Sequence, residues 1–127
     1  MRFKDFEAFQ FELSKLPPTE SIIVEDGVKW LSQEYAITRM NEVFGEGNWN
    51  IEKISKGDIS KNKDAQIGFS CALTVTYIHP ITGEEISRVG LSGDITPIDN
   101  NIIGRAFLNA ISSIGNTFGR LLSNQFE

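Results

Sequence analysis

The chain has 127 residues, of which 40% are hydrophobic and 23% charged, and its formal net charge at pH 7 is −5. These values predict one soluble globular domain with a core of its own, and the lack of an apolar run of about 18 residues excludes a membrane-spanning helix. One cysteine and one histidine cannot form an internal disulfide or an ordinary zinc cluster, and they fit a reducing cytoplasm. The N-terminus, MRFKDFEAF, mixes acids and bases and does not resemble a secretory signal.

The N-terminal segment, residues 2–15, predicts a short amphipathic helix, because its apolar residues recur every three to four positions: Phe3, Phe6, Phe9 and Leu13. Pro17 and Pro18 end this helix. It either caps the core of its own chain or packs on a neighbouring subunit, and the sequence leaves both open. We assign residues 1–18 to this helix and residues 21–123 to the core of a single domain. Residues 21–24 predict a short strand, and residues 25–27 a turn.

The middle of the chain predicts a helix over residues 32–44 followed by a three-stranded antiparallel meander. Ser32 is the expected N-cap of this helix, and Gly45 the expected C-cap. Residues 49–55 read as the first strand, residues 56–64 as a polar loop, and residues 67–77 as a strand whose alternation buries Cys71. His79 is interpreted as a turn residue of the next hairpin. Residues 84–91 form the third strand, in which Gly90 is interpreted as a bulge.

The final segment, residues 101–123, predicts one long amphipathic helix with a broad apolar face that packs across the sheet. Its opposite face contains no acid and consists of Arg105, Asn109, Ser112, Ser113, Asn116 and Arg120. The predicted fold is therefore α+β: a three-stranded antiparallel meander with a long C-terminal helix packed across it, preceded by helix, strand and helix.

No catalytic, cofactor-binding or metal-binding motif stands out. The phosphate-binding pattern G-x-x-x-x-G-K-[ST] does not occur, and one turn histidine gives no convincing Ser-His-acid arrangement. The carboxylate pairs lie at turns and are interpreted as solvated charge. We therefore expect neither an enzyme nor a cofactor.

The basic residues are unevenly distributed and suggest a site for an anionic polymer. They predict an electropositive track that binds the backbone of an anionic polymer such as nucleic acid, without sequence preference. The predicted DNA-binding residues are Arg105, Arg120, Asn109, Ser112, Asn116, Lys53, Lys56, Lys61, Lys63 and Arg88. The alternative is an ordinary solvated face.

Two motifs resemble those of the Rad-fifty-two-like single-strand annealing proteins. Residues 40–45, M-N-E-V-F-G, with Gly47 and Trp49, resemble the family pattern N-x-x-F-G followed by G-x-W or N-W. Residues 113–119, S-I-G-N-T-F-G, resemble its second pattern, S-[FI]-G-N-x-x-G. The element order also agrees over residues 21–123, and the size suits a small phage or bacterial member.

The resemblance implies a cytoplasmic protein of recombination and repair that forms a homo-oligomeric ring and anneals single-stranded DNA without a nucleotide cofactor. A recombinase or a single-strand-binding protein is a further candidate partner, and a membrane is not. Eukaryotic members carry a Lys/Arg cluster where this chain has Leu108, Asn109 and Ser112. Arg105 and Arg120 would substitute for that cluster. The competing hypothesis is an oligomeric structural or adaptor protein that keeps the fold without binding DNA.

Overall fold

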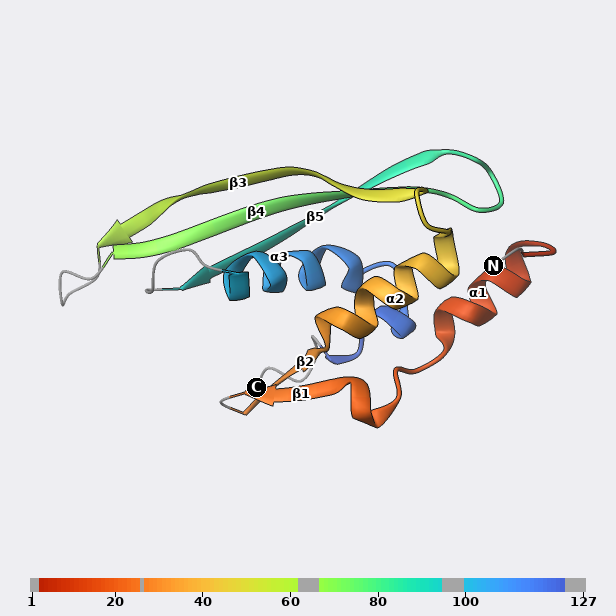
Figure 1. Ribbon diagram of the computed structural model, residues 1–127, viewed down its shortest axis with the longest axis horizontal. Coiled ribbons are helices and arrows are strands. Elements are labelled where there is room, and N and C mark those ends of the chain that lie inside the picture. The colour runs from red at the N-terminus through yellow and green to blue at the C-terminus, as the bar shows by residue number, and fades with distance from the viewer. Residues whose placement is uncertain (1–2, 26, 62–66, 95–99, 123–127) are drawn as a thin grey trace.

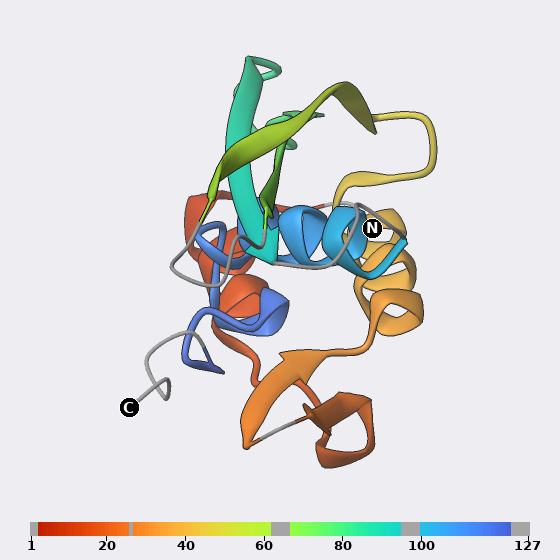
Figure 2. The same cartoon turned by 90° about the vertical axis from the view of Figure 1, so that its left-hand side faces the viewer.

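The computed structural model describes residues 3–25, 27–61, 67–94 and 100–122. Its elements are α1 (Phe6–Ser14), the 3₁₀ helix η1 (Thr19–Ser21), β1 (Ile22–Glu25), β2 (Val28–Leu31), α2 (Gln33–Phe44), β3 (Trp49–Lys61), β4 (Ile67–Ile78), β5 (Glu85–Asp94), α3 (Asn100–Ser112) and the 3₁₀ helix η2 (Asn116–Phe118). The sheet β3-β4-β5 lies on one side of α2 and α3, and the hairpin β1-β2 lies on the other (Figures 1 and 2). The predicted α+β class is confirmed.

The three-stranded antiparallel meander is confirmed, and α3 lies across β4 and β5 (Figure 1). Alternate residues of β4, among them Cys71, Leu73 and Val75, are fully buried under this helix. Gly90 is no bulge, because the register between β4 and β5 is continuous there. A Cβ at Gly90 would lie 1.9 Å from the carbonyl oxygen of Ala106, so glycine is needed for the close approach of β5 and α3.

The start of the domain differs from the expected single strand, because residues 28–31 form a second strand. β1 and β2 pair antiparallel from Ile22↔Leu31 to Glu25↔Val28, and Gly27, at φ 79°, lies in the turn between them. The hairpin then leads into α2, whose caps are confirmed: Ser32 accepts a hydrogen bond from the Tyr35 amide (3.4 Å), and Gly45 has φ 91°.

The C-terminal helix was predicted too long, since α3 ends at Ser112 and not near residue 123. In its last turn the Ser112 hydroxyl donates to the Asn109 carbonyl (2.9 Å), a local bond that competes with helix continuation. The chain then packs on α1, where a Cβ at Gly115 would lie 2.8 Å from the Leu13 Cβ. After this turn, η2 buries Phe118 in the core.

Two further expectations were decided by tertiary contacts. β3 continues to Lys61, so the polar residues 56–61 belong to a strand and not to a loop, because pairing with β4 supplies their backbone partners. α1 caps the core of its own chain, with Phe9 and Leu13 buried.

His79 is confirmed in the β4–β5 turn, where its Nδ1 accepts a hydrogen bond from the Ile81 amide (3.1 Å) and its ring lies 4.9 Å from that of Phe9.

Candidate nucleic-acid interface

The residues of the first motif build the corner between α2 and β3. Asn41 accepts a hydrogen bond from the Trp49 indole nitrogen (2.7 Å), and Asn48 donates its amide to the Phe44 carbonyl (3.0 Å). The Trp49 ring is half-buried and stacks on Phe107 of α3 at 5.8 Å between centroids. Trp49 thus contacts the end of α2 through Asn41, and the roles of these residues are structural.

The second motif meets the first in the core, although about 70 positions separate them in the sequence. The rings of Phe44 and Phe118 stack at 6.1 Å with an interplanar angle of 15°. The Arg39 Nε donates to the Thr117 hydroxyl (2.8 Å), which joins η2 to α2. The two motifs therefore account for the packing of α2 against η2, not for a surface that touches a ligand.

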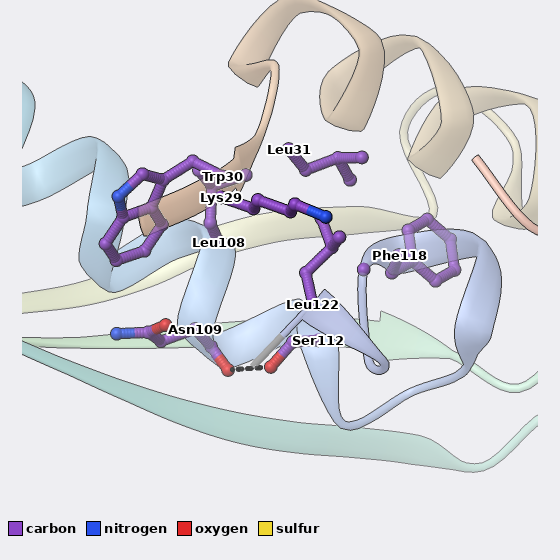
Figure 3. Close-up of a pocket in the computed structure, with 9 residues that line it drawn as sticks. Lys29, Trp30, Leu31, Leu108, Asn109, Ser112, Phe118 and Leu122 are labelled. Atoms are coloured by element: carbon purple, nitrogen blue, oxygen red, sulfur yellow. Dashed lines mark hydrogen bonds between the residues drawn. The ribbon is translucent and has the colours of Figure 1, made fainter. Parts of the chain in front are cut away.

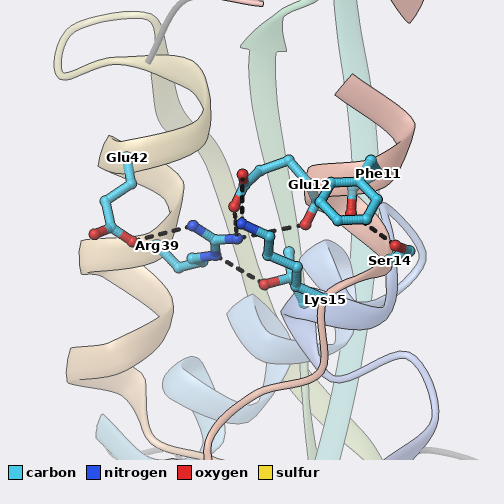
Figure 4. A network of polar contacts seen from close by, with 7 residues as sticks. Phe11, Glu12, Ser14, Lys15, Arg39 and Glu42 are labelled. Carbon is cyan, nitrogen blue, oxygen red and sulfur yellow. Dashed lines mark hydrogen bonds and ion pairs between the residues drawn. The ribbon is translucent and has the colours of Figure 1, made fainter. Parts of the chain in front are cut away.

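A buried ion-pair network holds α1 against this junction (Figure 4). Glu12 forms an ion pair with Arg39 and accepts a hydrogen bond from Lys15 (3.1 Å), and Arg39 also pairs with Glu42 (3.3 Å). Burial raises the pKa of Glu12, but the hydrogen bonds from Arg39 and Lys15 outweigh it and hold that pKa below its usual value. Burial lowers the pKa of Arg39, but the contacts with Glu12 and Glu42 reverse that effect and raise it. Both groups are charged at neutral pH.

An open groove lies between β2 and α3, closed at one end by the segment after η2 (Figure 3). Its volume is about 270 Å³. We call it the β2–α3 groove and define it by its lining residues: Lys29, Trp30, Leu31, Leu108, Asn109, Ser112, Phe118, Gly119 and Leu122. Among these described residues Lys29 is charged and none is acidic, so the lining favours an anion.

Two of the predicted residues, Asn109 and Ser112, line the groove, and a third, Arg105, precedes them on α3. The guanidinium of Arg105 lies over the Trp30 ring, 5.3 Å from its centroid, while Asn109 and Ser112 follow one and two turns further along the helix. The Asn109 amide donates to the Leu91 carbonyl (2.7 Å) and thereby ties α3 to β5. An aromatic ring paired with a guanidinium, with the lysine Lys29 next to it in the strand, is a combination that can stack a base and attract its phosphate.

The structure does not bring the other predicted residues into this groove. Arg120 and Asn116 line a separate hollow against α1, because α3 ends before them. Arg88 is half-buried, and its Nε has no hydrogen-bond partner among the described residues. The backbones of Lys53, Lys56 and Lys61 belong to β3, in the sheet on the other side of α3 from β2 (Figure 1), and Lys63 lies outside the described residues.

Lys29 and Trp30 were missed in the sequence. The signal was weak: an adjacent cation and aromatic residue, half-way along the four residues 28–31, for which no element was predicted. Recognising residues 25–27 as the turn of a complete hairpin would have placed both on a strand, with Trp30 opposite Ile23.

A scan against protein-family models finds no match for this chain, and a search of curated proteins also finds none. In the described part of the chain, no helix combines the length and apolar character needed to cross a membrane. The described residues also contain no cluster of His, Cys, Asp and Glu side chains that could hold a metal ion.

Proposed function

We propose that this chain binds single-stranded DNA in the β2–α3 groove and anneals complementary strands as a homo-oligomeric ring, without ATP. The observation that carries the proposal is the pairing of Trp30 with Arg105 at the open groove, whose lining also includes the exposed Lys29. Aromatic platforms beside cations are how proteins bind single strands without sequence preference, since every base has a face that can stack. The net charge of −5 does not oppose this, because binding depends on the local field.

The shape of the groove favours a strand over a small molecule. Pockets for small molecules are enclosed clefts that bury most of their ligand, whereas this groove is open to solvent. One stacked base contributes about 1–3 kcal/mol, which is too little for stable binding by one protomer. Repetition of the groove around an oligomer would multiply this contribution, because a strand held at one site is presented to the next at high effective concentration.

The edges of the sheet support association between protomers. Within the described part of the chain, no strand pairs with the outer edge of β3 or of β5. Val89 and Leu91 on β5 also expose 63% and 66% of their surface. Open edges and exposed apolar side chains are usually covered in stable proteins. We expect sedimentation velocity at micromolar concentration to show an oligomer, and a stable monomer would contradict the ring.

The direct test measures binding of a fluorescent oligothymidine by anisotropy over a range of salt concentrations. Trp30→Ala should weaken binding about 5- to 150-fold, the equivalent of one stacked base, for each protomer that the oligonucleotide contacts. Arg105→Gln should lower the log–log salt slope by about 0.7 for each phosphate contact that is lost. Lys4→Gln is the matched control, since Lys4 is an exposed cation outside the groove.

Strand annealing is tested separately, by the rate at which two complementary oligonucleotides form a duplex in the absence of ATP. The protein should accelerate this step, and Trp30→Ala should reduce the acceleration. Each variant is first compared with the original chain by sedimentation. An oligomer that binds no single-stranded DNA at low salt would favour the structural or adaptor protein instead.

A further inference from the structure

A second hollow, on the α1 side of η2, has a different chemical character from the groove. It is open to solvent, and we call it the Arg120 pocket. Its polar rim is formed by Gln10 and Ser14 of α1 together with Asn116 and Arg120. The remaining lining consists of Leu13, Ile114 and Gly115, so no described lining residue is aromatic and the pocket offers no platform for stacking a base.

The charges around the pocket favour an oxyanion. Arg120 is its only charged lining residue among those described, and its planar guanidinium suits phosphate oxygens. Glu12 lies on the same helix as Gln10, but it is buried and its charge is paired with Arg39 and Lys15. The amides of Gln10 and Asn116 can add neutral donors beside the guanidinium.

The walls of the pocket are fixed by the core. Gly115 packs so closely on Leu13 that a side chain would not fit between them. The neighbouring Thr117 is fully buried and accepts the hydrogen bond from Arg39. The backbone that presents Asn116 and Arg120 is therefore anchored on both α1 and α2, which favours a preorganised site.

The same short segment forms a wall of both hollows. Ser112, Phe118 and Gly119 line the β2–α3 groove, and Asn116 and Arg120 line the Arg120 pocket. Gly119 and Arg120 are consecutive, so the two hollows lie on neighbouring parts of one short segment. The groove offers the aromatic ring, and the pocket offers donors for an anion.

We propose that the Arg120 pocket holds a backbone phosphate of single-stranded DNA where the strand leaves the β2–α3 groove across η2. This inference rests on the proposed function and deepens it: bases contact the groove at Trp30, and the phosphate contact lies on the other side of η2. It also gives α1 a role in binding, because Gln10 contributes to the rim.

The test uses oligothymidines in which one phosphate at a time is replaced by an uncharged methylphosphonate. For the original chain, replacement of the phosphate that contacts Arg120 should weaken binding. Arg120→Gln should be insensitive to replacement at that position and equally sensitive elsewhere, because the contact is already lost. Its log–log salt slope should fall by about 0.7 for each protomer that the oligonucleotide spans.

Gln10→Glu is a second variant that adds repulsion without removing Arg120. Gln10 is exposed on α1, so folding should be unchanged by circular dichroism while binding weakens. Trp30→Ala should weaken binding to oligothymidines of every length. Replacement of the same phosphate by methylphosphonate should still weaken the binding of this variant.

The outcomes separate the two proposals. If the original chain binds no oligothymidine, the proposed function fails and this inference fails with it. If it binds, and Arg120→Gln retains the full methylphosphonate pattern and the full salt slope, DNA binding stands and the Arg120 pocket is excluded as its phosphate contact.

Discussion

Replacing Glu12 by leucine should strongly destabilise the fold, because it leaves Arg39 without its main buried partner. Removal of one member of a buried ion pair costs about 3–5 kcal/mol. We expect a value of about 3 kcal/mol, at the lower end, because Arg39 keeps its ion pair with the more exposed Glu42 (3.3 Å) and its hydrogen bond to Thr117 (2.8 Å). Urea unfolding followed by tryptophan fluorescence measures the difference.

The double variant Glu12→Leu/Arg39→Met tests the cause. Apolar replacement of a complete buried pair is often neutral, so the double variant should lose less stability than the sum of the two single variants. Additive losses in this cycle would refute the reasoning, since they would show that the two charges do not depend on each other.

The same pair predicts a dependence on pH whose sign follows from Glu12. Its pKa is lowered in the folded state, whereas in the unfolded chain it is about 4.3. The stability that the carboxylate contributes is therefore fully present above the unfolded pKa and is lost as pH falls through the lower folded pKa. The destabilisation by Glu12→Leu should be constant from pH 6 to 8, an interval well above about 4.3, and should shrink in stronger acid. An unchanged difference at low pH would contradict the assignment.

Four further substitutions, at three positions, test the packing of α3 on the sheet and of the β4–β5 turn, each by urea unfolding. Trp49→Phe keeps a ring but loses the hydrogen bond to Asn41, and should cost about 1–2 kcal/mol, while Trp49→Ala should cost about 3 kcal/mol or more. Gly90→Ala should cost about 3 kcal/mol, because the new Cβ would overlap the Ala106 carbonyl, and an effect below 1 kcal/mol would contradict the close approach. His79→Ala should cost about 1–3 kcal/mol, because two amides of the β4–β5 turn lose their acceptor.

Local signals predicted most elements of the fold correctly. Alternation in residues 67–77 predicted β4, and the spacing of Phe3, Phe6, Phe9 and Leu13 predicted α1, because a half-buried strand and a half-buried helix each impose a period on the sequence. The caps of α2 were visible for the same reason, since Ser32 and Gly45 act on neighbours three or four positions away.

The candidate site was predicted only where its residues share one regular element. Arg105, Asn109 and Ser112 follow the helical period of α3 and lie together on it. Arg120 was assigned to the same face by extending that period through Gly115, where contact with Leu13 of α1 sets the backbone course. Helical periodicity cannot include a contact with a residue 100 positions earlier in the chain.

The sequence by itself determined the α+β class, the meander and the course of α3 as far as Ser112, because periodicity and caps depend on near neighbours. The tertiary structure decided the rest: the stacking of Phe44 on Phe118, the pairing of Glu12 with Arg39, and the placement of Trp30 beside Arg105. These pairs join different elements, and their positions follow from how the buried surfaces of helices and strands fit together. The β2–α3 groove and the Arg120 pocket are consequences of that fit.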